Sequence, residues 1–180
     1  MSKLRADIER FYSLRGIHVP LTTLQLSMAC LNPRVLPVFL LRFAEWSDKH
    51  GLGPFAKVFA MLNVLIFGIE VSPKVKIGGG LFLPHTVGTV IGAERIGSNC
   101  TIMQGVTLGS AEPDLNFTAT TRPVIGDDVL IGAGAKVIGR VTVGDHAKIG
   151  ANAVVLKDVP AHSLAVGVPA TVKALGDIDG

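Results

Sequence analysis

Charge is scarce in this sequence, and neither sign of charge is gathered into a run. Only 17% of the 180 residues are charged, whereas soluble domains have about 25%. The 17 basic and 14 acidic side chains leave a formal net charge of +3. A protein that binds nucleic acid carries a basic patch or stripe, which this chain lacks. We therefore expect no nucleic acid among its partners.

Cysteine and long apolar runs are also scarce. Cys30 and Cys100 are too few and too far apart for a disulfide framework or a thiolate metal site. The most apolar stretch, 55–71, contains a lysine, an asparagine and a glutamate and is shorter than the roughly 20 residues of a spanning helix. It fits a packed helix or a helix on a membrane surface. The first residues lack a secretory signal pattern. We expect a cytoplasmic protein, with a peripheral contact at the inner face of the membrane left open.

The first part of the chain has helical periodicity. Apolar residues recur every three or four positions from Leu4 to Phe11, with charged residues on the other side. Prolines interrupt the sequence after Gly16, and one of them opens a later apolar segment. The pattern predicts three helices, over residues 2–14, 38–49 and 54–67. Residues 1–70 are expected to form a small helical region.

From Val71 onward the apolar period changes to six residues. Most of the aliphatic residues in the clearest run are followed by glycine, and each has a small or β-branched residue four positions later. Both positions are predicted to face a narrow interior. The run consists of Ile125, Ile131, Val137, Val143, Ile149 and Val155.

The same phase occurs earlier in the chain, with two interruptions. It makes Leu83 an inward residue and also places Val87 inward. The spacing from Leu83 to Ile96 exceeds two hexads by one residue, so the register slips beside His85. A long excess after Leu108 predicts that a loop over residues 110–124 is extruded from the coil.

A six-residue repeat fits a triangular solenoid in which each hexad forms one short strand and a turn. Three hexads complete a coil, and neighbouring coils lie ~4.8 Å apart. We therefore predict a mainly β fold, a parallel β-helix over residues 71–175, with the helical region before it. The hand of the coil does not follow from the repeat.

The repeat segments VIGAERIGSNCTIMQGVTLGS and IGDDVLIGAGAKVIGRVTVGDHAKIGANAVVLKDVPAHSLAVGVPA resemble the hexapeptide-repeat acyltransferases, specifically their serine acetyltransferase branch. The segments ADIERFYSLRG and GIEVSPKVKIGGG resemble other parts of these enzymes. The resemblance implies a left-handed parallel β-helix, homotrimers or pairs of trimers, and acetyl-CoA as co-substrate without a metal. It also implies that the substrates lie in clefts between neighbouring prisms.

The resemblance assigns catalysis to a histidine. The segment LFLPHTVG places His85 at the family's catalytic position, with Pro84 where the family has an aspartate. His85 follows the inward Leu83 by two residues and is therefore expected on the prism wall, within reach of a neighbouring subunit. A neutral imidazole there can accept a proton from a hydroxyl that attacks a thioester. A surface histidine without a role is the alternative, and no nearby repeat histidines suggest a zinc site.

Three departures from the family pattern bear on the acceptor. Besides Pro84, Arg122 stands where the loop of these enzymes has a second functional histidine, and the segment LRG near the N-terminus lacks an acceptor-binding aspartate. Without partner carboxylates, the ammonium group of serine would be unpaired in a closed cleft. We therefore predict that Thr121 and Arg122 bind a small-molecule or lipid-linked sugar, as in the colanic-acid-type O-acetyltransferases that the chain also resembles.

The donor half of the site matches the family better. A structural role is the alternative for its small residues, because a tight coil needs glycine and alanine. The leading hypothesis is an acetyl-CoA-dependent O-acetyltransferase acting on a sugar or surface-polysaccharide precursor. Serine O-acetyltransferase of cysteine biosynthesis and a non-catalytic β-helix scaffold are the alternatives. The resemblance implies acetyl-CoA contacts at Ser110, Ala111, Ala133, Ala151, Gly167, Pro169 and Lys173.

Overall fold

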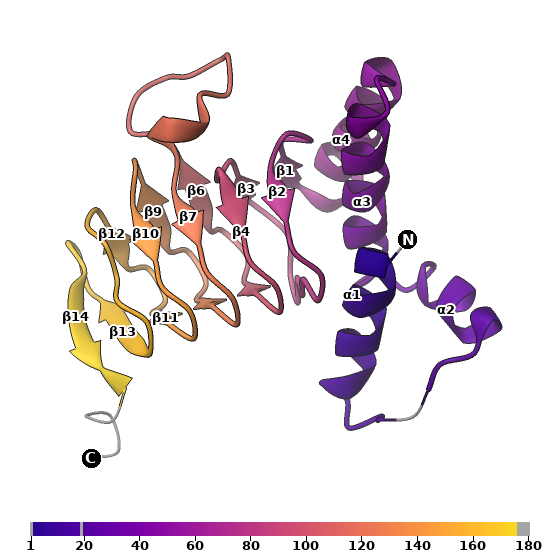
Figure 1. Cartoon of the computed structure of the whole chain (residues 1–180), viewed down its shortest axis with the longest axis horizontal. Coiled ribbons are helices and arrows are strands. Elements are labelled where there is room, and N and C mark those ends of the chain that lie inside the picture. Colours follow the sequence, from indigo (N-terminus) through magenta and orange to yellow (C-terminus); the bar gives the residue numbers. More distant parts are fainter. Residues whose placement is uncertain (1, 19, 176–180) are drawn as a thin grey trace.

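The structure is a computed structural model that describes residues 2–18 and 20–175. A group of helices lies across one end of an elongated prism of short strands (Figure 1). The three predicted helices are present, each within two residues of its predicted ends. The helices are α1 (Ser2–Ser13), α2 (Thr23–Ala29), α3 (Leu36–Lys49) and α4 (Gly53–Phe67).

Helix α2 was not predicted, although the sequence contains a signal for its start. The side chain of Thr22 accepts a hydrogen bond from the backbone of Gln25, and the side chain of Gln25 accepts one from the backbone of Thr22. This reciprocal pair is a capping box, which a Thr-x-x-Gln sequence can indicate. The helix is only seven residues long, so it offers too few turns for its periodicity to be recognised.

The apolar segment 55–71 forms most of α4 and the strand after it. Helix α4 packs beside α3 (Figure 1), with Ala56 and Asn63 buried between them. Other large apolar side chains of α4, including Met61 and Leu65, are exposed. No helix among the described residues is both long and apolar enough to cross a bilayer.

The prism consists of three sheets of very short strands, wound so that each of the middle coils adds one strand to each sheet. The sheet orders are β1-β3-β6-β9-β12, β2-β4-β7-β10 and β5-β8-β11-β13-β14. All pairings are parallel except that of β14, which runs antiparallel to β13 at the far end of the prism. The strands are β1 (Ile69–Val71), β2 (Lys76–Ile77), β3 (Thr89–Ile91), β4 (Arg95–Ile96), β5 (Thr101–Ile102), β6 (Thr107–Gly109), β7 (Val124–Ile125), β8 (Leu130–Ile131), β9 (Lys136–Ile138), β10 (Thr142–Val143), β11 (Lys148–Ile149), β12 (Val154–Val155), β13 (Ser163–Val166) and β14 (Thr171–Ala174).

The core lies along the axis of the prism, in columns of aliphatic side chains. All six residues of the run from Ile125 to Val155 are at most 1% exposed. The small residues four positions after each of them, from Val129 to Val159, are at most 4% exposed. Register is conserved from coil to coil, as where Ile131 lies opposite both Ile102 and Ile149. The predicted hexad phase is therefore confirmed in this part of the chain.

The phase prediction is wrong at Val87, which is 74% exposed. Strand β3 places Thr89 and Ile91 inward instead, and Ile91 lies opposite Val71 in the first coil. Ile91 follows Leu83 by two residues more than one hexad. Because the inserted residues cannot enter the narrow core, segment 84–88 is pushed outward, and it carries His85.

A buried ion pair joins the helices to the open end of the prism. Arg42 donates to both carboxylate oxygens of Asp7, at 2.8 and 3.0 Å. Asp7 also accepts a 2.8 Å bond from the backbone N–H of Leu81, and Arg42 donates to the carbonyl of Ile77 at 3.0 Å. These contacts satisfy backbone groups of the first coil that an open strand edge would leave unpaired. The helical region therefore caps the β-helix.

Candidate active site

Two borders of one sheet carry the residues that the sequence singled out. We call the turns that lead into sheet β1-β3-β6-β9-β12 the His85 edge (residues 84–88, 103–105, 132–135 and 150–153). We call the turns that leave this sheet the loop edge (residues 92–94, 109–111 and 139–141). The connection from β6 to β7, residues 110–123, projects from the loop edge (Figure 1).

His85 is exposed at the first turn of the His85 edge. Its turn is fixed to the end of α4 by two bonds: the Thr86 hydroxyl donates to the carbonyl of Phe67 at 2.7 Å, and the N–H of Gly88 donates to the carbonyl of Gly68 at 2.9 Å. Among the described residues, no side chain hydrogen-bonds the imidazole. The ring is therefore held on an anchored turn with its nitrogens available to a substrate.

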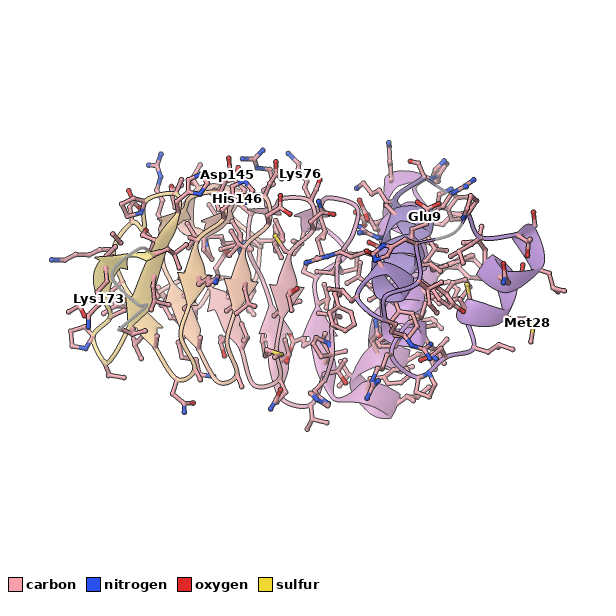
Figure 2. The ribbon with its side chains drawn as sticks, turned by 90° about the horizontal axis from the view of Figure 1, so that it is seen from below. Glu9, Met28, Lys76, Asp145, His146 and Lys173 are labelled. Carbon is pink, nitrogen blue, oxygen red and sulfur yellow. The ribbon has the colours of Figure 1, made fainter. Side chains whose placement is uncertain are left out.

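Two of the predicted donor residues, Ala133 and Ala151, lie on this same edge, where the N–H of Asn152 donates to the carbonyl of Ala133 at 2.8 Å. Gly167 continues the line beyond the last turn of the edge, and its carbonyl accepts a 3.0 Å bond from the N–H of Val154. With coils ~4.8 Å apart, the line from His85 to Gly167 spans four coils, or about 19 Å. The path suits an extended chain-like ligand. Two further donor candidates, Pro169 and Lys173, lie beyond it, and Figure 2 shows Lys173 at the far end of the prism.

Ser110 and Ala111 lie on the opposite border of the sheet, at the base of the loop. Strand β6 separates them from the His85 edge, and an extended chain rises about 3.3 Å per residue. The six steps from Gln104 to Ser110 therefore span at most about 20 Å, since Gln104 and Gly105 form a turn rather than extended chain. One protomer does not bring its loop base next to its own Ala133 and Ala151.

A cavity of about 630 Å³ lies between the loop and the outer face of this sheet. Strands β1, β3 and β6 supply its floor, and loop residues from Ser110 to Phe117 supply the other side. We call it the loop cavity. A second hollow of about 450 Å³ lies by the loop and is lined by Thr121 and Arg140. The two predicted acceptor residues thus line different cavities, because Arg122 lines the first and Thr121 the second.

Arg122 is only 8% exposed, and its guanidinium group is engaged within the protein. Nη1 donates to the carbonyl of Gly92 at 2.8 Å, and Nη2 donates to a carboxylate oxygen of Asp114 at 2.9 Å. The guanidinium carbon lies 4.2 Å from the centre of the Phe117 ring. Burial acts to raise the pKa of Asp114, but hydrogen bonds from the Thr118 backbone and from Arg122 outweigh it, and this pKa lies below its ordinary value.

Glu70 is a site residue that the sequence reasoning missed. It projects outward from β1, opposite Val90, and lines the loop cavity together with Glu112. Among the described residues it forms no salt bridge, so its carboxylate is free to pair with a cation. The sequence signal that could have found Glu70 is the alternation of the segment Ile69–Val71, in which Glu70 is the outward residue. The loop cavity therefore offers carboxylates, from the wall and from the loop, that the sequence-based expectation did not include.

Among residues 2–18 and 20–175, no group of three or more His, Cys, Asp or Glu side chains is placed to hold a metal ion. His146 and His162, which stack with ring centres 4.7 Å apart, lie between sheets β2-β4-β7-β10 and β5-β8-β11-β13-β14. They are therefore on a different edge from His85. Figure 2 shows His146 and Asp145 along the same side of the prism as Lys76. Neither histidine contributes to the loop cavity.

Comparison with known proteins shows the family to which the chain belongs. Residues 122–157 match the family described as bacterial transferase hexapeptide (six repeats). The chain is 44% identical over 138 residues to a serine acetyltransferase of Helicobacter pylori, an alignment that covers 76% of this chain and 79% of that enzyme. It belongs to the serine acetyltransferase family, and it is an acyltransferase. The relatives favour serine acetyltransferase over the sugar-directed reading, and they give no support to closeness with the polysaccharide O-acetyltransferases.

Solved structures agree with this assignment. The soybean serine acetyltransferase apoenzyme has a TM-score of 0.81 and 32% identity, covering 96% of this chain and 68% of that one. A serine acetyltransferase in complex with CoA has a TM-score of 0.79 and 29% identity, with coverage of 96% and 68%. The predicted fold, a left-handed parallel β-helix preceded by helices, is confirmed.

Proposed function

We propose that the protein transfers the acetyl group of acetyl-CoA to the hydroxyl of L-serine. Acetyl-CoA is the co-substrate of the family to which the chain belongs. The observation that carries the choice of acceptor is the charge of the loop cavity. It offers the carboxylates of Glu70 and Glu112 together with the ammonium group of Lys74. Paired groups of both signs suit a small zwitterion, whose ammonium and carboxylate both need partners in a closed site.

His85 acts as the general base in this proposal. Its imidazole accepts the proton of the serine hydroxyl as the oxygen attacks the thioester carbonyl. A tetrahedral oxyanion forms, and backbone N–H groups stabilise it. The intermediate collapses by breaking the carbon–sulfur bond, and the imidazolium returns the proton to the departing CoA thiolate. Carboxylates of the loop cavity can pair with the substrate ammonium or with the imidazolium while it is charged.

The active unit is proposed to be a homotrimer. The His85 edge and the loop edge of one chain are up to about 20 Å apart across the sheet. The proposed path of acetyl-CoA runs along the His85 edge, so a loop edge that closes over this path comes from a neighbouring chain. Ala133, Ala151 and Gly167 would then hold the arm beside His85 of one chain, and Ser110 and Ala111 of the next chain would close over it. A three-fold assembly supplies this interface three times through one repeated contact.

The test is an acceptor panel with the purified full chain and acetyl-CoA, in which mass spectrometry detects the acetylated product and free CoA is measured in parallel. We expect O-acetylserine and CoA in equal amounts with L-serine. L-Alanine, which has the same backbone groups but no hydroxyl, is the matched control and gives no product. Rapid acetylation of a sugar, with no product from L-serine, would contradict the proposed acceptor and restore the sugar-directed reading.

A further inference from the structure

We propose that Arg122 is a positioning residue that fixes the shape of the acceptor site by fastening the loop to the prism. It would do so through Gly92, Asp114 and Phe117, without itself binding the acceptor. The proposal rests on the proposed function, because it concerns the acceptor of that reaction. It differs from the sequence-based prediction, which has Arg122 bind the acceptor directly.

The contacts of Arg122 connect two parts of the chain that are otherwise separate. Gly92 belongs to the prism, at the turn after β3, and accepts from Nη1. Asp114 belongs to the loop, and both its backbone carbonyl and its carboxylate accept from Nη2, at 3.1 and 2.9 Å. A planar guanidinium can bridge two such acceptors at a fixed separation, which a lysine cannot do with the same geometry. Arg122 therefore sets how far the loop stands from the wall.

Asp114 in turn organises the loop itself. Its carboxylate accepts bonds from the backbone N–H groups of Asn116 and Thr118, at 3.1 and 2.6 Å. Phe117, between them, has φ 58°, in the left-handed region that bulky side chains rarely adopt. The Phe117 ring lies against the guanidinium of Arg122, a favourable cation–π contact that offsets this strain. Strained residues of this kind persist where surrounding contacts hold them, often at functional sites.

The fastened residues form one side of the loop cavity. Glu112, Asp114 and Phe117 line it from the loop, opposite Glu70 on the wall. A change in the height of the loop would change the distance between these carboxylates. The placement of the loop, and so the fit of the acceptor, is what Arg122 provides.

Steady-state kinetics of four variants test the proposal: Arg122→Ala, Arg122→Lys, Asp114→Asn and the double variant Arg122→Ala with Asp114→Asn. We expect each of Arg122→Ala and Asp114→Asn to raise the KM for L-serine by roughly tenfold, and the double variant to be no worse than either. The KM for acetyl-CoA and the melting temperature should change little. Arg122→Lys should recover part of the loss because it restores one charged contact. Arg95→Ala, an exposed arginine on another sheet, is the control.

A direct contact between Arg122 and the acceptor predicts a different pattern. In that case Asp114→Asn would leave the KM for serine unchanged, and the two effects would add in the double variant; either result overturns the proposal. Hydrogen exchange of residues 110–121 tests the fastening without any acceptor. Faster exchange in Arg122→Ala and Phe117→Leu is expected. Unchanged exchange would show that Arg122 does not fasten the loop to the prism. If L-serine is not a substrate, hydrogen exchange still tests whether Arg122 fastens the loop. A wrong acceptor can therefore be told apart from a wrong role for Arg122.

Discussion

At the scale of single residues, exposure separates side chains that can react with a substrate from those that hold neighbouring parts of the protein in place. His85 is exposed on an anchored turn, whereas Arg122 and Asp7 are buried and spend their charges on intramolecular partners. The motif in the sequence located His85 but could not tell that Arg122 faces inward, because a loop sequence does not reveal which neighbours its side chains meet. The same reasoning missed Glu70, which shares the loop cavity with residues of a loop that begins 40 positions later in the chain.

We expect His85→Ala to fold normally and to lose about 10²–10⁴-fold in turnover, because an exposed side chain contributes little to the core while a general base supplies a factor of that size. Steady-state rates and a thermal melt measure the two effects. His146→Ala is the matched control, since His146 is also exposed but lies on another edge. A turnover within threefold of the parent would remove His85 from the mechanism.

The buried thiol gives a second prediction at this scale. Burial is the largest cause that raises the pKa of Cys100, from 9.0 to about 11. At pH 8 the folded protein should therefore react with a thiol reagent at Cys30, which is half-buried, and much more slowly at Cys100. Peptide mapping of the labelled sites checks this. Since the folded state holds the proton more tightly, the contribution of Cys100 to stability is fully present below pH ~9 and is lost as pH rises toward 11.

At the scale of elements, the repeat predicted most of the fold because its physical basis is local. Each hexad forms one strand and points one aliphatic side chain from it into the prism interior. The position of a residue within its hexad therefore determines whether it faces the core or the solvent. The prediction fails where that link breaks: at Val87 the chain inserts extra residues, and only the pairing of Ile91 with Val71 shows where the register resumes. The sequence analysis did not predict helix α2 for another reason. The stability of this helix comes from its N-terminal cap and from packing beside α1.

We expect Ile131→Asp to prevent folding, because a carboxylate would be placed in a column that is 0% exposed and has no partner for it. Such substitutions belong to the class that costs more than about 4 kcal/mol. Ala135→Phe should fail as well, through excess volume in the same column. Far-UV circular dichroism and a melting curve measure the result.

Lys148→Asp is the control for these core variants. It also introduces a carboxylate, on the neighbouring strand β11 of the same sheet, but Lys148 points outward and is exposed. It should retain a cooperative transition. A soluble and cooperatively melting Ile131→Asp protein would show that the hexad phase is wrong.

At the scale of the whole molecule, the positions of the two edges connect catalysis to assembly. The prism is rigid and its strands are short, so neither edge can bend toward the other across the sheet between them. The sequence-based prediction names donor-binding candidates but not their division into two groups on opposite borders of the sheet. That division appears only when the hexads are wound into coils, because the winding places Ala111 and Ala133 on opposite borders of the same sheet.

Mixed assemblies test this division. His85→Ala removes the base from one edge, and Ala111→Trp places a bulky ring at the exposed base of the loop, across the proposed path of acetyl-CoA. Each variant alone should be inactive, because every interface then lacks one of the two halves. In trimers assembled from equal amounts of both chains, about a quarter of the interfaces pair an intact His85 with an intact loop base. We therefore expect co-expressed chains to recover a substantial fraction of the parental turnover, in particles of three times the 18.9 kDa chain mass by light scattering. If the mixed trimers have the same mass but are as inactive as each variant alone, the whole site lies within one chain. In that case every chain carries a defect in its own site, and mixing the chains cannot restore it.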